Sequence, residues 1–121
     1  MYTAYVLEEE ARASLLEMFP PKYNKTIAHH ITLEFGVGEA TAIPEDAEIA
    51  IIGHVDNHDG LEALVVTVDG TAARPDGGYY HITWSLNPLR YKPVDSNKLV
   101  KHLPWKYQEV INICTIPKLL K

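Results

Sequence analysis

Two segments of the chain alternate polar and apolar side chains with the period of two that is typical of a β-strand. The first covers residues 29–35 and the second covers 79–86, and each is centred on the tripeptide His-Ile-Thr, at 30–32 and at 81–83. Because successive side chains of a strand point to opposite faces, each isoleucine shares the apolar face while histidine and threonine share the polar one. The pattern predicts two strands that bury one face in a core and present an imidazole and a hydroxyl on the other.

Strict alternation assigns the neighbouring side chains as well. In the first segment it places Leu33 and Phe35 on the core face. In the second it places Tyr80 and Trp84 in the core, while Ser85 joins the polar face.

Helix and turn signals divide the rest of the chain. Three glutamates at 8–10 stand where the positive end of a helix dipole favours them, and Pro20-Pro21 ends that helix. The turn-forming residues 57–60 predict a hairpin. We expect strands at 2–7, 49–55, 61–68 and 107–116, and a second, short helix at 98–103. Each half of the chain then holds a helix and one His-Ile-Thr strand, which indicates a duplicated α+β arrangement.

The length of the chain allows one hydrophobic core. Two independent domains would each need roughly 100 residues, whereas the whole chain has 121. We therefore expect a single domain over residues 1–121. Sixteen acidic and eleven basic side chains give a formal net charge of −5, which disfavours a broad interface with long duplex nucleic acid. If the protein handles nucleotides, it does so at a local site.

Cysteine content and hydropathy give an expectation for the compartment. The single cysteine, Cys114, has no partner for an internal disulfide and no metal-ligand spacing around it, which fits a reducing environment. The first residues lack the basic and apolar regions of a secretory signal, and no run approaches the roughly 20 apolar residues of a membrane helix. We expect a cytoplasmic protein with no membrane partner. The sequence leaves the oligomeric state open.

The paired tripeptides suit phosphodiester chemistry without a metal or cofactor. A neutral imidazole accepts a proton from water or a ribose hydroxyl, while a protonated imidazole donates one to the departing oxygen. We assign these roles to His30 and His81, without deciding which is the base. The hydroxyls of Thr32 and Thr83 are expected to hold the non-bridging phosphate oxygens, whose negative charge must be stabilised in the transition state.

With these motifs the chain resembles the 2H phosphoesterases, a family named for two histidines in paired His-x-Thr/Ser motifs flanked by apolar residues. The segments 30–33 and 81–84 match the pattern in full. The segments 28–33, 74–77 and 93–97 also resemble the small bacterial and phage RNA-repair-like members. The resemblance implies a bilobal α+β fold in which two pseudo-symmetric antiparallel sheets face a central cleft, with the helices outside.

The resemblance further implies a metal-independent phosphodiesterase, classed as a hydrolase, that carries out hydrolysis or transesterification of a phosphodiester next to a ribose hydroxyl. Substrates in the family include 2′,3′-cyclic phosphates at RNA ends, ADP-ribose cyclic phosphate and, in phage anti-CBASS enzymes, cyclic oligonucleotides. The acidic balance of the chain favours a small nucleotide or a chain end over a long strand. The alternative is a protein that binds or sequesters a nucleotide in the same pocket without turnover.

Aromatic and basic side chains in loops are further candidates for the site. Aromatic rings commonly stack on nucleotide bases, and two tyrosines in loop or strand-entry positions, Tyr23 and Tyr79, are expected to bind substrate in this way. Four cations in loops are expected to be solvated and are not assigned to the site: Lys22, Lys25, Arg90 and Lys92.

A metal site is the remaining alternative. His54 and His58 have the spacing of zinc ligands on a helix, but the local pattern predicts a strand and a turn, so we assign no metal ligand. Gly36-Val37-Gly38 lacks the third glycine and the following helix of a dinucleotide-binding loop.

Overall fold

The computed structural model describes residues 1–121 as eight strands, two α-helices and one turn of 3-10 helix. The elements run in the order β1 (Tyr2–Leu7), α1 (Glu9–Met18), β2 (Lys25–Thr26), β3 (His30–Phe35), β4 (Ile49–Asp56), β5 (Leu61–Val68), β6 (His81–Leu86), η1 (Pro93–Asp95), α2 (Ser96–His102), β7 (Lys106–Ile113) and β8 (Thr115–Leu120). Neither helix has the length and apolar character needed to cross a membrane.

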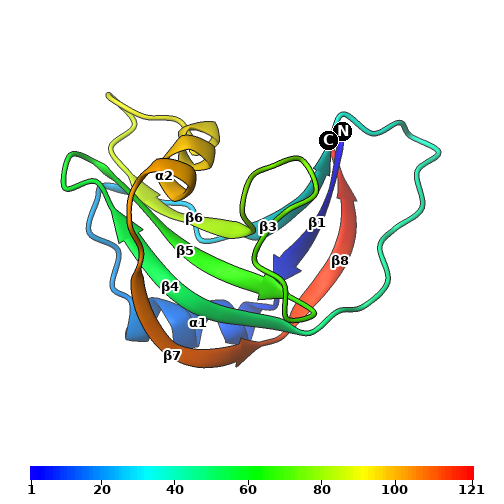
Figure 1. Ribbon diagram of the computed structural model, residues 1–121, viewed down its shortest axis with the longest axis horizontal. Helices are drawn as coiled ribbons and strands as arrows, with labels where there is room; N and C mark the ends of the chain where they lie inside the picture. Colours follow the sequence, from blue (N-terminus) through cyan, green and yellow to red (C-terminus); the bar gives the residue numbers. More distant parts are fainter.

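Two antiparallel sheets carry the fold (Figure 1). The smaller has three strands in the order β3-β1-β8, and the larger has five in the order β2-β6-β5-β4-β7. With its two helices the protein belongs to the α+β class, as expected. The chain termini lie close together at one end of the smaller sheet (Figure 1).

Two segments of backbone pass from one sheet to the other and close the structure along both edges. Residues 25–35 pair first with β6 and then with β1, and residues 106–120 pair first with β4 and then with β1. The first segment bends at Ala28, which has a positive φ of 41° and is fully buried. Because both edges are joined in this way, the sheets enclose a common core and place β3 beside β6.

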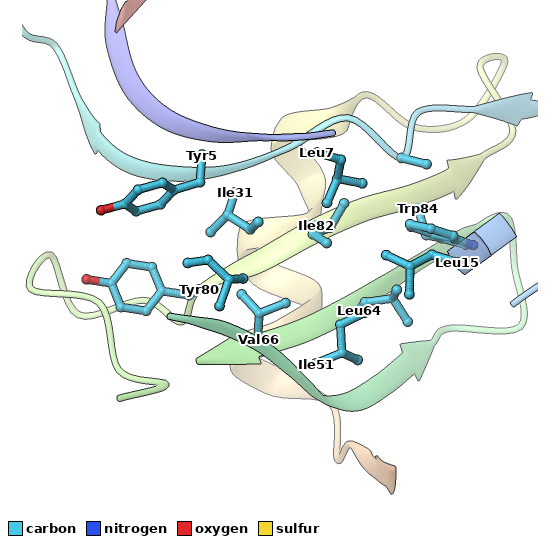
Figure 2. Packing of buried hydrophobic residues seen from close by; sticks show 12 residues of the cluster. Tyr5, Leu7, Leu15, Ile31, Ile51, Leu64, Val66, Tyr80, Ile82 and Trp84 are labelled. Atoms are coloured by element: carbon cyan, nitrogen blue, oxygen red, sulfur yellow. The ribbon is translucent and has the colours of Figure 1, made fainter. Parts of the chain in front are cut away.

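The main core lies between the two sheets (Figure 2). It combines side chains of β1 and β3 with those of β4, β5 and β6, and Leu15 of α1 packs against them. Trp84 is fully buried there and donates Nε1–H to the carbonyl of Phe19 at 2.7 Å. Burying a large apolar side chain stabilises a fold by about 1.5–3 kcal/mol, so this core fixes the position of both sheets.

A second, smaller cluster covers the opposite face of the larger sheet. Ala63 and Val65 of β5 pack there with Leu99 and Val100 of α2. Their neighbours Leu64 and Val66 belong to the main core, as expected when successive side chains alternate. Helix α2 therefore lies on the face of β5 and β6 that points away from the space between the sheets.

The expected elements agree with the structure except near the C-terminus. The strands at 2–7 and 61–68, the first helix and the hairpin of β4 with β5 are confirmed. The prediction of one strand over 107–116 was wrong, because the chain leaves β4 after Ile113 and joins β1 from Thr115. Sequence periodicity does not reveal a change of pairing partner.

Register shifts overturn two side-chain assignments. Leu33 has no partner in the pairing of β3 with β1, and Trp84 has none in the pairing of β6 with β5. Each is an extra residue, and it reverses the facing of the side chains that come after it in the strand. Phe35 is therefore half exposed rather than in the core. Ser85 leaves the face of Thr83 and bonds Glu62 instead.

Candidate functional site

All four side chains of the two His-x-Thr motifs line one pocket. The pocket has a volume of about 190 Å³ and lies where β3 of the smaller sheet meets β6 of the larger one. His30 and Thr32 come from β3, and His81 and Thr83 come from β6. The rest of the wall is formed by Tyr2, Ile27, Phe35, Pro93, Val94 and Asn97.

Strand geometry and backbone pairing bring the motifs together. Ile31 and Ile82 are fully buried in the main core, so histidine and threonine of each strand lie on the opposite face. The N–H groups of residues 27 and 28 donate to the carbonyls of residues 84 and 83, at 2.9 and 3.0 Å. These bonds hold the beginning of β3 against β6 and align the two polar faces.

His81 is held by a bond to its own strand. Its Nδ1 lies 2.8 Å from the carbonyl oxygen of Tyr79, and a carbonyl only accepts, so Nδ1 carries the hydrogen. Nε2 is then the nitrogen with the free lone pair. Burial lowers the pKa of His81; the bond to Tyr79 opposes this effect, while the positive charge of Arg74 adds to it.

His30 has a different environment. Its Nδ1 is 2.9 Å from Nδ1 of His29, so one of the two rings donates and the other accepts. The ring of Tyr2 lies 5.3 Å from the imidazole, centroid to centroid. Burial lowers the pKa of His30 to about 4, and the neighbouring His29 and His81 act in the same direction. Both motif imidazoles are therefore neutral at pH 7 in the free protein.

The two motif threonines are not equivalent. Thr83 Oγ1 donates to Ser96 Oγ at 2.9 Å, and the carbonyl of Pro93 lies at 3.3 Å. Ser96 is fully buried at the start of α2, so this contact ties β6 to the helix. Thr32 makes no comparable contact and its hydroxyl lines the pocket without a partner in the protein. A bound anion therefore meets one free hydroxyl and one that is already engaged.

The aromatic side chains at the pocket differ from those expected. Tyr2 and Phe35 line it. Tyr23 and Tyr79, which we expected to stack on a base, are not among the residues that line it. Tyr23 OH donates to Asp56, and Tyr79 packs edge-on against Trp105 with 4.9 Å between ring centroids. The shift of register at Leu33 brings Phe35 to this face, and local alternation gives no sign of it.

Arg74 lies directly behind one wall of the pocket. Its side chain is 3% exposed. Nε donates to Asp76 Oδ1 and Nη2 to Asn97 Oδ1, each at 2.9 Å. Its guanidinium carbon lies 5.3 Å from the centroid of the Phe35 ring. The segments 74–77 and 93–97, both noted in the sequence, therefore meet at this residue, although spacing alone assigned neither of them to the site.

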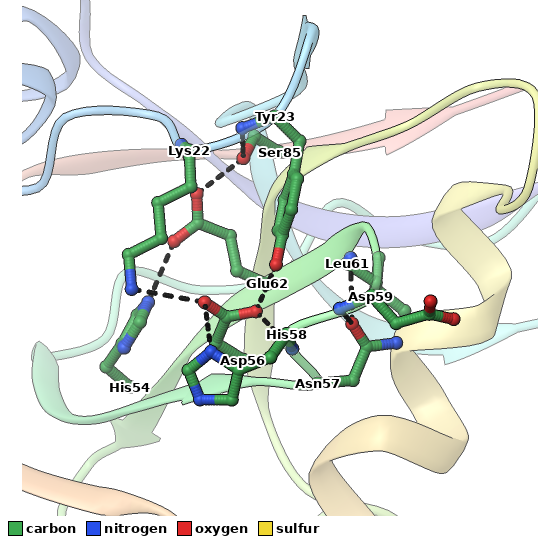
Figure 3. A network of polar contacts seen from close by, with 10 residues as sticks. All are labelled: Lys22, Tyr23, His54, Asp56, Asn57, His58, Asp59, Leu61, Glu62 and Ser85. Carbon is green, nitrogen blue, oxygen red and sulfur yellow. Dashed lines mark hydrogen bonds and ion pairs between the residues drawn. The ribbon is translucent and has the colours of Figure 1, made fainter.

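A separate polar network lies around Glu62 (Figure 3). Glu62 is 1% exposed and accepts hydrogen bonds from His54 Nε2 and the Lys22 amide, both at 2.8 Å, and from the Ser85 hydroxyl. Burial acts to raise the pKa of Glu62, but these hydrogen bonds lower it below its ordinary value. Every hydrogen bond that Glu62 accepts comes from another side chain or from the backbone, and none of these residues lines the pocket of the two motifs.

The two histidines with zinc-like spacing, His54 and His58, both contact carboxylates of this network. His54 is bonded to Glu62, whereas the side chain of His58 is 82% exposed and lies 3.6 Å from Asp56. No group of three or more His, Cys, Asp or Glu side chains is arranged to hold a metal ion.

Comparison with known proteins gives no relative: no family model, no curated protein and no solved structure matches the chain.

Proposed function

We propose that the protein is a metal-independent phosphodiesterase of the 2H type, acting on a nucleotide or an RNA end. The observation that carries the proposal is that His30, Thr32, His81 and Thr83 line one pocket. Two imidazoles and a free hydroxyl around one small cavity are the groups needed to move protons on both sides of a phosphorus atom and to hold its oxygens.

We assign the base to His81 and the acid to His30. The bond from His81 Nδ1 to Tyr79 leaves the lone pair of Nε2 free to accept a proton. The nearby charge of Arg74 disfavours the protonated form of His81. Neither arginine nor lysine is among the groups that lower the pKa of His30, which are burial and the neighbouring His29 and His81, so an anionic substrate in the pocket stabilises its protonated form most directly. The protonated ring then donates to the leaving oxygen.

The size of the pocket supports a small reactive group. Pockets that enclose drug-sized ligands measure about 300–1,000 Å³, whereas this one measures about 190 Å³. We propose that it takes a phosphodiester and the adjacent sugar, with the base against the Tyr2 and Phe35 rings that line the pocket. A 2′,3′-cyclic phosphate, ADP-ribose cyclic phosphate or the exposed linkage of a cyclic oligonucleotide fits this requirement, and a long duplex does not.

The two-lobed arrangement of the 2H family is part of the proposal. Each sheet contributes one motif strand, β3 in the smaller and β6 in the larger, so each sheet is taken as one lobe. A cytoplasmic location is proposed as well, because the free thiol of Cys114 is exposed and persists in a reducing compartment.

The test is an incubation of the purified protein with 2′,3′-cyclic mononucleotides, ADP-ribose cyclic phosphate and cyclic oligonucleotides, each with and without EDTA. We expect turnover of at least one of these classes, no effect of EDTA, and loss of activity in His30→Ala and in His81→Ala. His58→Ala, on the exposed hairpin turn, is the matched histidine control and retains activity.

Two outcomes would contradict the proposal. Tight binding without product would identify a nucleotide-sequestering protein that uses the same pocket. Turnover that EDTA abolishes would show metal catalysis, and the two-histidine mechanism would then be wrong.

A further inference from the structure

Arg74 presents an unmatched donor beside the pocket. Its Nη1 is buried and has no hydrogen-bond partner, and no other buried side-chain nitrogen or oxygen in the protein is in this position. Burying a guanidinium is costly unless its N–H groups are engaged. A fold that has satisfied every other buried side-chain polar atom therefore leaves this donor free.

The partners of Arg74 locate it relative to the pocket. Asn97 accepts from Nη2, and the guanidinium carbon lies over the Phe35 ring. Both of these residues line the pocket with the two motif histidines. Arg74 itself is not part of the pocket wall, and Asn97 and Phe35 are the pocket residues that contact its guanidinium. Arginine is well suited to bind phosphate, because its planar fork of donors matches phosphate oxygens.

Asp76, the counter-ion of Arg74, neutralises only part of the positive charge of the guanidinium. Asp76 contacts only Nε, and the side chain of Asp76 is half exposed, so solvent weakens this pair. Arg74 is the buried cation of the protein, whereas Arg90, paired with Asp59, is 58% exposed. In a chain of net charge −5, this guanidinium gives the pocket a local positive charge.

We propose that Arg74 is the anion-binding residue of this pocket and that its free Nη1 donates to a non-bridging oxygen of a bound phosphate group. The inference rests on the proposed function only for the identity of the phosphate ester. The binding of an anion is a separate property and can be measured without turnover.

The experiment titrates the protein with inorganic phosphate and follows the imidazole resonances of His30 and His81 by NMR, so that binding is recorded in this pocket. We expect Arg74→Lys, which keeps the charge but loses the fork, to bind phosphate at least about tenfold more weakly, as for loss of a charge-assisted hydrogen bond. Arg90→Lys is the matched control and leaves phosphate binding unchanged.

Asp76→Asn is a second variant whose result does not depend on loss of function. In the wild type, Arg74 Nε and the Gly78 amide both donate to Asp76 Oδ1, at 2.9 and 3.0 Å. An asparagine oxygen can accept both bonds, so the substitution removes the negative charge and keeps the geometry. We expect phosphate to bind severalfold more tightly, and misfolding cannot produce such a gain.

The proposal is overturned if wild-type protein does not bind phosphate in this pocket, if folded Arg74→Lys binds it as tightly as wild type, or if Asp76→Asn shows no gain. If Arg74→Lys does not fold, the phosphate affinity of Asp76→Asn decides the question. Tighter binding than wild type supports the proposal, and unchanged binding overturns it. The two proposals can also fail separately. If wild-type protein hydrolyses no diester but Arg74→Lys still loses phosphate binding, the anion-binding role of Arg74 is supported and the phosphodiesterase function is rejected.

Discussion

The Nδ1 of His81 donates a hydrogen bond of 2.8 Å to the backbone carbonyl of Tyr79, two residues earlier in the chain. This contact fixes the tautomer of a buried imidazole before any ligand arrives. With the lone pair on Nε2 and a pKa lowered chiefly by burial, His81 is prepared to accept a proton. His30, with a pKa lowered to about 4, is equally neutral but has no bond to a carbonyl.

The first prediction concerns the pH dependence of kcat/KM. The proposed mechanism needs His81 neutral and His30 protonated, and both pKa values lie below the ordinary 6.5. The fraction of free protein with His30 protonated falls as pH rises above about 4. We therefore expect kcat/KM to be highest below pH 6.5 and to fall towards neutrality. A profile that is flat to pH 8 would show that His30 is not the acid.

The second prediction separates the two threonines. Thr32→Val removes a hydroxyl that has no partner in the protein, so we expect kcat/KM to fall at least about tenfold, as for a lost transition-state hydrogen bond, with an unchanged urea midpoint. Thr83→Val leaves the buried Ser96 hydroxyl without its partner and is expected to cost about 1–3 kcal/mol of unfolding free energy. Equal effects of Thr32→Val and Thr83→Val on the free energy of unfolding would contradict the different bonding of the two hydroxyls.

The third prediction concerns the turn before β5. Gly60 has a φ of +122°, and a Cβ there would lie 3.1 Å from the Cβ of Asn87 and 3.3 Å from the Tyr91 ring. We expect Gly60→Ala to destabilise the fold by more than about 1–2 kcal/mol, the cost of backbone strain alone. Gly70→Ala is the control, because Gly70 has a φ of +83° but nothing within 4 Å. Similar losses in urea unfolding would show that crowding at Gly60 is unimportant.

The fourth prediction tests the network around Glu62. Glu62→Gln places an amide NH2 group among donors and is expected to cost about 3–5 kcal/mol, as for a broken buried charge network. Glu10→Gln, on the exposed surface of α1, should change stability by less than about 0.5 kcal/mol. The folded fraction of Glu62→Gln should keep wild-type kcat/KM, because this network lies outside the pocket. A selective loss of activity would place Glu62 in the mechanism.

The same carboxylate contributes to acid sensitivity. The pKa of Glu62 is lowered in the fold, so its contribution to stability is present above the ordinary value of 4.5 and is lost as pH falls through the lower folded value.

The imidazole of His30 affects stability at higher pH than the Glu62 carboxylate does. Its folded pKa is also lowered, so protonation favours the unfolded chain as pH falls from 6.5 to about 4. Unfolding free energies of His30→Gln should fall less steeply than those of wild type over that window.

Much of the fold can be predicted from local sequence. Periodicity and turn residues predict β1, α1, β5 and the β4–β5 hairpin, because these elements depend on contacts between near neighbours. Alternation across the two His-Ile-Thr segments also predicts that each histidine shares a face with its threonine. The arrangement of the four side chains around one pocket is consistent with that expectation, although neither motif shows by itself that β3 will lie beside β6.

Pairing between distant strands decided the rest. The unpaired residues Leu33 and Trp84 bring Phe35 to the pocket and take Ser85 away from it, and such bulges arise from the register of a partner strand, which local alternation does not encode. The contacts of Arg74 with Asn97, and of Thr83 with Ser96, join residues far apart in the chain. The sequence by itself determined which chemical groups are present and which face of each strand they share. Only the closure of the two sheets decided which of those groups meet, because that depends on how the whole core packs.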